Sequence, residues 1–575
     1  MLDSLLSSPQ ATILTAKICA GVTCFAVAWF RPRWGERVFG AIERLGGRFA
    51  AERKVAILFV ALFTIGLRAS LLKVAPIPAP HVHDEFSYLL AADTFAHGRL
   101  ANPPHPMRVF FETFHVNQWP AYMSKYPPGQ GFVLAIGEIL GEPWIGVLLS
   151  VAAMYAAMLW MIEGWMPRRW ALLGTLLAFA QFGVWNAWTN SYWGGAVPAI
   201  GGALMIGALP RIFRAWHWRD AVLLGCGVAI LANSRPFEGA VLCAPVVAVL
   251  VWWIFSVRRP TWRVVISRVI SPIALVLVCT GAFMAYYNWR GTGHALLMPY
   301  ALNDRAYMTA PTFVWQHANP RIEYDNPQFE DFYNGWTYEH WEARHFDGSW
   351  ASAKHIFHDT ARIYPGMFVR GELLVVAVIV LPWLWRNRRG RFLLAVCAAG
   401  FLALCATVWL QDLTLHYAAP FIGATFATVT LAVRYLHAWR FRGRRMGIFL
   451  TRALVAAVLA LSAIDAAAAI RQYASDQQDY RASFRVPVIE KLEGIPGQHL
   501  VIVRYGADHD VGLEWVYNRA DIDRAKIVWA REIPGVNMRP LLDYFKGREA
   551  WLVEPDEGPD GGGPRISRYP VPSSR

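Results

Sequence analysis

Residues 143–165 decide the fold class, and their sequence is PWIGVLLSVAAMYAAMLWMIEGW. One charged residue, Glu163, interrupts this apolar stretch near its end. About 20 mostly apolar residues cross a bilayer as a helix, because lipid offers no partner to an exposed backbone amide. With 55% hydrophobic and 17% charged residues over the whole chain, the sequence predicts a polytopic α-helical membrane protein. It excludes a disordered, collagenous or disulfide-stapled chain.

Similar apolar stretches recur on both sides of residues 143–165, and about twelve spans are predicted in all. They are residues 11–30, 55–74, 143–165, 171–188, 195–210, 221–233, 239–257, 269–287, 372–386, 392–410, 418–436 and 448–468. The first is the weakest, since Lys17 lies inside it. Whether residues 11–30 span the membrane therefore stays open.

The basic residues orient the chain. Lys and Arg gather in alternate loops, around residues 31–54, 168–169, 211–219, 258–268, 386–391 and 434–445, whereas the intervening short turns hold only Arg235. Because basic loops stay in the cytoplasm, three long segments are predicted to face outward: residues 75–142, 288–371 and 469–575. The basic residues behind the formal net charge of +14 then lie in the cytoplasmic loops, and nucleic acid is excluded as a partner.

The cysteines carry no recognisable chemistry. All seven lie inside apolar runs, and no CxxC or Cys/His pair has the spacing of metal ligands. The sequence therefore predicts neither a zinc site nor a disulfide framework, and the cysteines are small packing residues.

The segment 469–575 differs in composition from the rest. His499–Tyr505, Lys526–Ala530 and Ala550–Val553 are predicted strands, and Arg539–Phe545 is a predicted amphipathic helix. We expect a small α/β domain here, with disorder over the acidic, Gly/Pro-rich stretch Glu554–Pro564. Since no catalytic arrangement is evident in it, the segment is predicted to be accessory. The predicted domains are residues 1–54, an additional helix and a basic cytoplasmic loop, residues 55–468, a transmembrane domain, and residues 469–575.

The first outward loop, residues 75–142, carries the candidate chemistry. It begins with three prolines and then HVHDEFSY at residues 81–88, which places Asp84 and Glu85 side by side just outside a span. Phe86 to Gly98 is predicted to be an amphipathic helix lying in the membrane interface. Lys125 and Tyr126 then open the element KYPPGQ, residues 125–130, ahead of a second apolar segment.

These motifs resemble those of the GT-C glycosyltransferases of the protein O-mannosyltransferase and aminoarabinose transferase type. The resemblance rests on the Asp-Glu pair after the first core helix, on the Lys-Tyr-Pro-Pro element, and on HYAAP at residues 416–420. It extends over roughly residues 51–470. Two features depart from the pattern: Tyr126 intervenes where the family element is usually Lys-Pro-Pro-Leu, and the helix at residues 11–30 is additional. The implied fold is GT-C-like, with about 11–12 transmembrane helices, interfacial helices in the first outward loop and a small C-terminal soluble domain.

The resemblance implies an enzyme that transfers a sugar, with inversion, from a polyprenyl-phosphate carrier to a lipid, glycan or protein acceptor outside an inner membrane. Asp84 suits the base that takes the acceptor proton, and a neighbouring Glu85 is expected to raise the pKa of one member of the pair by repulsion. Cations suit the leaving phosphate. The candidate substrate-binding residues are His83, Lys125, Tyr126, Arg235, His416 and Tyr417.

Each of these residues has a structural alternative. The acid pair would also suit a solvated helix start, and Lys125 would also suit a lysine that extends its ammonium to the membrane surface. Arg235 would also suit an ion pair with Glu238. His416 would also suit an ordinary hydrogen-bonded histidine. His81, His83 and Asp84 together resemble a metal-binding cluster, so a divalent metal is an alternative, although imidazole at an interface more often only forms hydrogen bonds. No other cofactor is predicted.

The second outward loop, residues 288–371, is rich in aromatic residues with polar residues between them. Such faces stack on carbohydrate or lipid head groups, but interfacial anchoring gives the same composition.

Three other functions remain open. A transporter or flippase is disfavoured because few ionisable residues lie deep in the predicted spans. A ligase or phosphotransferase that moves a whole glycan or a phosphorylated head group would use the same kind of site. A nonenzymatic scaffold would leave the acid pair unexplained. A nucleotide-sugar donor is disfavoured because the site faces outward and no phosphate-binding Gly-rich loop is present.

Overall fold

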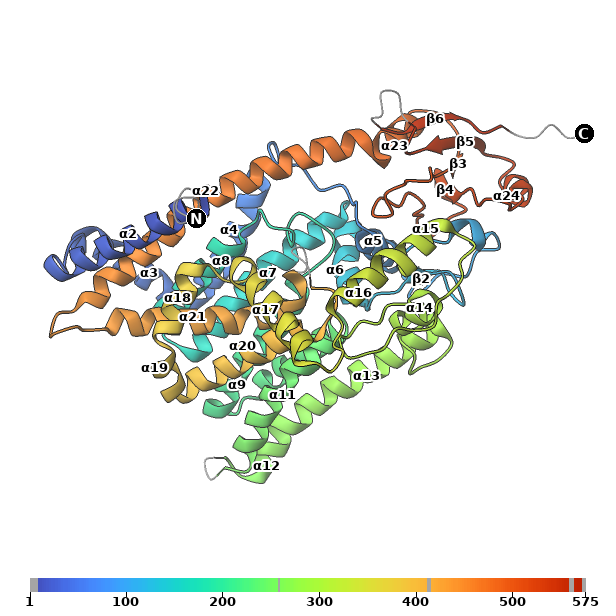
Figure 1. Cartoon of the computed structure of the whole chain (residues 1–575). Helices are drawn as coiled ribbons and strands as arrows, with labels where there is room; N and C mark the ends of the chain where they lie inside the picture. The colour runs from blue at the N-terminus through green and yellow to red at the C-terminus, as the bar shows by residue number, and fades with distance from the viewer. Residues whose placement is uncertain (1–8, 257–258, 411–414, 558–562, 571–575) are drawn as a thin grey trace, which may run out of the picture.

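The computed structural model describes residues 9–256, 259–410, 415–557 and 563–570. Its body is a bundle of helices, and one long helix, α22 (Met446–Ser483), leads from this bundle to a small sheet domain near the C-terminus (Figure 1). The chain is a multi-pass helical membrane protein with a small C-terminal α/β region, as the sequence predicts.

Within the described residues, seven helices are long and apolar enough to cross a membrane. They are α7 (Pro143–Trp165), α9 (Ala196–Ala215), α11 (Pro236–Ile254), a continuous helix of α12 (Trp262–Val265), η2 (Ile266–Ile270) and α13 (Ser271–Thr292), α20 (Arg388–Ala406), α21 (Ile422–Ala438) with part of η4 (Leu415–Phe421), and α22. Each coincides with a predicted span. The helices α7, α9 and α21 form the buried centre of the bundle, whereas α13 and α22 are mostly exposed along its outside.

The other five predicted spans are also helical, but length and apolarity alone do not identify them as membrane spans. They correspond to α2 (Pro9–Phe30), α4 (Arg53–Ser70), α8 (Arg168–Phe182), α10 (Trp218–Ala232), and the pair α18 (Gly371–Ile379) and α19 (Leu381–Arg386). Both α8 and α10 have 15 residues, and α4 carries basic side chains in its first and last turns. The predicted span 372–386 breaks at Val380, next to a proline in the first turn of α19, because proline cannot continue a helical hydrogen-bond ladder.

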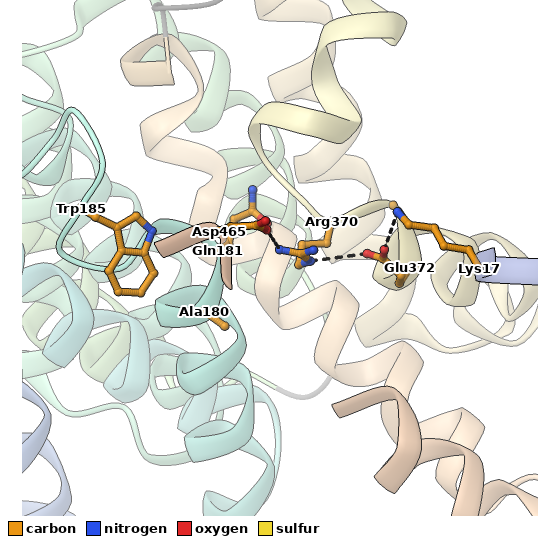
Figure 2. A pocket seen from close by; sticks show the side chains of 8 residues that line it. Lys17, Ala180, Gln181, Trp185, Arg370, Glu372 and Asp465 are labelled. Atoms are coloured by element: carbon orange, nitrogen blue, oxygen red, sulfur yellow. Dashed lines mark hydrogen bonds and ion pairs between the residues drawn. The ribbon is translucent and has the colours of Figure 1, made fainter. Parts of the chain in front are cut away.

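A chain of charges holds α2 against the bundle. Lys17 Nζ lies 2.8 Å from Glu372 Oε1, and Arg370 Nη1 lies 2.6 Å from Asp465 Oδ2. Arg370 Nε is 3.5 Å from Glu372 Oε2, so the four charges alternate in sign along one wall of a cavity of about 250 Å³ (Figure 2). The lysine that interrupts the predicted span 11–30 is therefore neutralised by a partner on α18.

The first outward loop folds into short elements at one end of the bundle. They are α5 (His83–Ala96), η1 (Arg108–Phe111), the two-stranded hairpin of β1 (Val116–Asn117) and β2 (Met123–Ser124), and α6 (Pro128–Ile139). Nine of the fourteen residues of α5 are buried. The sequence predicts an amphipathic helix lying in the membrane interface, but α5 is covered on most sides by α6, the hairpin and the C-terminal domain.

The second outward loop is helical over much of its length. Its elements are α14 (Pro299–Tyr307), α15 (Pro327–Phe329), η3 (Glu330–Trp336), α16 (Thr337–Arg344) and α17 (Trp350–Met367). Aromatic rings of this loop pack on Phe114 of the first loop, with centroids 4.5 Å away at Phe332 and 4.9 Å away at Phe329. The two outward loops therefore share one aromatic cluster.

The C-terminal domain contains the predicted strands. Helix α23 (Arg485–Glu493) precedes β3 (His499–Val503), β4 (Ile527–Arg531), α24 (Arg539–Tyr544), β5 (Glu549–Glu554) and β6 (Arg565–Arg568). The sheet order is β4-β3-β5-β6, parallel except for the edge strand β6, which the sequence did not predict. Part of the stretch Glu554–Pro564, for which the sequence predicts disorder, is residues 558–562 and lies outside the described residues, while Glu554 itself closes β5.

This domain is continuous with the membrane bundle and packs on the first outward loop. Its expected start at residue 469 lies inside α22, whose 38 residues extend over about 57 Å. Leu90 of α5 and Phe111 of η1 share a hydrophobic cluster with Leu500 and Ile502 of β3. The C-terminal domain therefore covers α5 (Figure 1).

Candidate active site

Glu85 fixes the start of α5. Its Oε2 accepts hydrogen bonds from the backbone N–H groups of His81 and Val82, at 2.9 and 3.2 Å, and its Oε1 accepts one from the backbone N–H of Tyr192, at 2.8 Å. The side chain is fully buried. These contacts satisfy backbone donors that a helix start leaves without partners, so Glu85 caps α5 and ties it to the turn before α9.

Asp84, the residue before Glu85, points instead toward the hairpin. Its Oδ1 accepts a hydrogen bond from the Tyr126 hydroxyl and lies 2.6 Å from His115 Nδ1. The same hydroxyl lies 3.1 Å from His115 Nδ1, so the three side chains form a closed cluster. Within the described residues no hydrogen bond reaches Asp84 Oδ2, and 17% of the side chain is exposed.

His115 is the residue of this cluster that sequence reasoning missed. It follows an aromatic stretch with no motif around it, and the sequence gives no signal for it. Its backbone has a φ of 60°, a left-handed conformation that costs energy for a residue other than glycine and gathers at functional sites. Its carbonyl accepts hydrogen bonds from Ser87 Oγ, at 2.7 Å, and from the Lys125 backbone N–H, at 3.1 Å.

The pKa of Asp84 lies below its ordinary value. Burial by itself raises this pKa, but the charge of His115, the hydrogen bonds from His115 and Tyr126, and the charge of Lys125 together lower it. Repulsion from Glu85 does not raise the pKa of Asp84, because the Glu85 carboxylate points away, to the backbone N–H groups of His81, Val82 and Tyr192. Burial and Lys125 lower the pKa of His115, while the charge of Asp84 and its hydrogen bond act in the opposite direction.

Lys125 lies next to this carboxylate, inside the protein. It follows β2, and its Nζ lies 4.9 Å from the ring centroid of Tyr300 and 5.5 Å from that of Tyr126. Burial lowers the pKa of this ammonium, while Asp304 and Asp84 act in the opposite direction. Burial raises the pKa of Asp304, on α14, to about 6 in spite of Lys125. The lysine is therefore a buried cation, not an exposed snorkelling side chain.

A small pocket opens beside Lys125. It is walled by the prolines that begin α6 and α14 and by Met284 and Asn288 of α13, with Asn233 at the end of α10. Apolar walls around one buried cation suit a ligand with an anionic head and an apolar chain.

Arg235 and the HYAAP element meet the same region from two other turns. The Arg235 guanidinium lies over the ring of Tyr417, 4.7 Å from its centroid, and the buried ring of His416 lies between Tyr417 and Trp193. The Gly129 N–H donates to the Asn233 carbonyl, at 2.7 Å, which joins the Lys-Tyr-Pro-Pro element to the Arg235 turn. Asp84 and Arg235 are close enough to act electrostatically on His416.

His83 and His81 lie on the other side of Asp84. His83 Nδ1 is 2.9 Å from the hydroxyl of Tyr517 in the C-terminal domain, and His81 Nδ1 is 3.5 Å from Glu85 Oε2. Burial lowers the pKa of His83 to about 3. The structure brings Lys125, Tyr126, Arg235, His416 and Tyr417 together around Asp84, and it turns His83 toward the C-terminal domain.

The residues present do not fit a divalent metal. Among the described residues no group of three or more His, Cys, Asp or Glu side chains is placed to hold one. The three candidate ligands engage different partners: Tyr517 for His83, Glu85 for His81, and Tyr126 with His115 for Asp84. A buried cation, Lys125, also acts on Asp84.

Comparisons with known proteins give structural similarities only. No protein-family model and no curated protein matches the chain. The chain is similar to ArnT from Cupriavidus metallidurans bound to undecaprenyl phosphate, with 13% identity and a TM-score of 0.48 over 87% of this chain and 92% of that one. It is also similar to an oligosaccharyltransferase from Archaeoglobus fulgidus tethered with an acceptor peptide, with 13% identity and a TM-score of 0.40 over 87% of this chain and 68% of that one. These similarities concern the fold alone, and the chemistry of the site rests on its own contacts.

Proposed function

We propose that the protein is an inverting glycosyltransferase that moves a sugar from a polyprenyl-phosphate carrier to a lipid, glycan or protein acceptor. The proposed site lies on the outer face of an inner membrane, since the basic loops lie at the other end of the bundle. One observation supports the proposal above the rest: Asp84 is an ionised carboxylate with one oxygen held by Tyr126 and His115 and the other without a hydrogen bond from the described residues.

In the proposed reaction the free oxygen of Asp84 accepts the proton of an acceptor hydroxyl. The hydroxyl oxygen bonds to the anomeric carbon from the face opposite the carrier, and the bond between that carbon and the phosphate oxygen breaks. The phosphate leaves with additional negative charge, which Lys125 and Arg235 stabilise. His115 and Tyr126 hold the carboxylate in one orientation during the transfer.

The low pKa of Asp84 in the free protein is compatible with this role. Lys125 is one of the charges that lower it, and a bound phosphate next to Lys125 neutralises that charge. Donor binding is therefore expected to raise the pKa of Asp84 and make it a stronger base in the complex.

The proposal is tested with purified protein and a radiolabelled polyprenyl-phosphate sugar. Asp84→Asn keeps the shape of the site but cannot take a proton, so it should bind the donor and lose transfer by about a hundredfold or more. Asp331→Asn, an exposed carboxylate of the second outward loop, is the matched control and should be fully active. Full transfer by Asp84→Asn would exclude Asp84 as the base. Donor movement across vesicles without any sugar transfer would instead support a flippase.

A further inference from the structure

Helix α3 (Glu36–Ala51) lies at the end of the bundle opposite the candidate site. The site lies where α7 begins and α22 ends, since Glu142 caps α7 beside Tyr192 and the Tyr480 hydroxyl of α22 donates to the Pro80 carbonyl. By contrast, Glu43 of α3 pairs with Arg452 near the start of α22, at 2.8 Å. The 23 residues of α7 separate the two ends by about 34 Å.

The neighbours of α3 along the chain place it across that end of the bundle. Only residues 31–35 separate it from α2, and Glu52 alone separates it from α4. The Arg168 guanidinium, at the start of α8, donates to the Ala51 carbonyl, and Arg53, at the start of α4, pairs with Glu163 near the end of α7. The helix therefore lies across that end of the bundle.

The faces of α3 differ sharply in composition. At about 100° per residue, Gly40, Gly47 and Ala50 fall on one side, which packs against α8 and α4. Val38, Ile42 and Leu45 fall on the opposite side and are 65%, 61% and 71% exposed. An apolar row of this kind, on a helix joined to apolar neighbours, enters the boundary between head groups and acyl chains.

A row of arginines runs beside the exposed apolar row. Arg37, Arg44 and Arg48 follow one another at intervals of seven and four residues, so they share one side of the helix. All three are exposed, and no carboxylate of the described residues lies within 4 Å of them. The two acids of α3, Glu36 and Glu43, lie on the packed side, where Glu43 has its partner Arg452.

We propose that α3 is a binding surface for anionic phospholipids in the leaflet opposite the candidate site. The apolar row of Val38, Ile42 and Leu45 enters the acyl region, and the arginine row of Arg37, Arg44 and Arg48 contacts the head-group phosphates. Because the acids lie on a different side of the helix, the arginine row is a positively charged patch. Such a patch binds lipids with net negative charge more tightly than zwitterionic lipids. Bidentate guanidinium–phosphate contacts add to this preference. The proposal does not depend on the reaction catalysed at the other end of the bundle.

The preference is measured on full-length protein in a neutral detergent, titrated with fluorescent phosphatidylglycerol and, separately, with fluorescent phosphatidylcholine. The wild type should bind phosphatidylglycerol more tightly. The variant Arg37→Gln/Arg44→Gln/Arg48→Gln should bind phosphatidylglycerol at least about tenfold more weakly, with phosphatidylcholine affinity unchanged. Raising the salt concentration should reduce the difference in the wild type.

A matched variant separates this surface from net charge. Arg386→Gln/Arg388→Gln/Arg391→Gln removes the same charge from the exposed junction of α19 and α20, at that end of the bundle, and it should keep the wild-type preference. The thermal unfolding midpoint, measured for each variant, identifies any loss that comes from misfolding. Equal affinities of the wild type for both lipids, an unchanged preference in the α3 variant, or an equal loss in the matched variant would each overturn the proposal.

Discussion

Asp84 and Glu85 are adjacent acids with opposite environments. The start of α5 directs Glu85 back onto its own backbone and onto Tyr192, where it is fully buried. It directs Asp84 toward Tyr126, which follows the hairpin β1–β2, and toward His115, which precedes it. Glu85 therefore stabilises the start of the helix, and Asp84 remains available for proton transfer. The sequence alone does not distinguish these two roles.

Replacing His115 by glutamine should shift the pH dependence of transfer. The charge of His115 and its hydrogen bond lower the pKa of Asp84, so their loss raises that pKa. The carboxylate then takes up a proton at a higher pH, and the acidic limb of the kcat/KM profile moves to higher pH. A pH series measures this shift.

The control for this prediction is His317→Gln, an exposed histidine of the second outward loop, whose profile should match that of the wild type. An acidic limb that does not move in His115→Gln would show that Asp84 ionisation does not govern the reaction.

Lys125→Ala should weaken donor binding. The substitution removes a buried cation beside the pocket, and a charged hydrogen bond to phosphate contributes about 1.5–3 kcal/mol, or roughly tenfold to a hundredfold in affinity. Binding of a nontransferable polyprenyl phosphate measures the loss. Lys73→Ala, an exposed lysine that precedes the first outward loop, is the matched control. Unchanged affinity in Lys125→Ala would make this lysine a structural residue only.

At the scale of elements, the hairpin β1–β2 aligns the site. Val116 pairs with Ser124, and the next hydrogen bond joins the Lys125 N–H to the His115 carbonyl. The partner of Asp84 and the candidate phosphate ligand are thus cross-strand neighbours. Loss of this register would separate them by several ångströms, since residues along a strand are about 3.3 Å apart.

Gly129→Ala should disturb the contact between two of these elements. A Cβ at this position would lie 2.6 Å from the Asn233 carbonyl oxygen, so the start of α6 and the Arg235 turn must move apart. Overpacking of this kind costs about 1–3 kcal/mol, and transfer should fall with stability. Thermal unfolding and transfer assays measure both effects.

Gly66→Ala provides the comparison, because a Cβ there meets nothing within 4 Å and alanine favours the helix. That variant should be as stable as the wild type or more stable. Wild-type stability in Gly129→Ala would contradict the close approach of the two elements.

At the scale of the whole molecule, the C-terminal domain is part of the site's surroundings. The ring of Tyr517 stacks on Phe86 of α5, with centroids 4.2 Å apart and planes 6° apart. The Tyr122 hydroxyl donates to the Asn518 carbonyl, and the Ala520 N–H donates to Asp93. The sequence predicts an accessory domain here. In the structure this domain covers α5, the helix that carries Asp84.

Two substitutions of Tyr517 should separate its hydrogen bond from its packing. Tyr517→Phe removes the contact with His83 but keeps the stack on Phe86, which costs about 1 kcal/mol. Tyr517→Ala removes both, and loss of a buried aromatic ring costs about 3–5 kcal/mol. The alanine variant should unfold at a clearly lower temperature and be cleaved faster by protease in the C-terminal domain. Equal behaviour of the two variants would contradict this packing role.

Sequence patterns predicted the helices well and the partners of the site poorly. Apolar runs located every span now seen as a long helix, because lipid imposes one requirement on all of them. They could not show that residues 372–386 break at Val380 or that α22 continues into the C-terminal domain. Spacing singled out Asp84 and Lys125 but gave no indication of His115, which lies 31 positions beyond Asp84 with no motif around it.

The sequence by itself determined a multi-pass helical membrane protein with alternating basic loops and an acid pair just after a span, since these properties depend on composition and local order. Only the tertiary structure decided which acid is free, which histidine holds it, and that the C-terminal domain covers α5. These depend on side-chain direction and on contacts between residues far apart in the chain. The ionisation of Asp84 is set by His115, Tyr126 and Lys125 together, and only the folded chain brings them to one carboxylate.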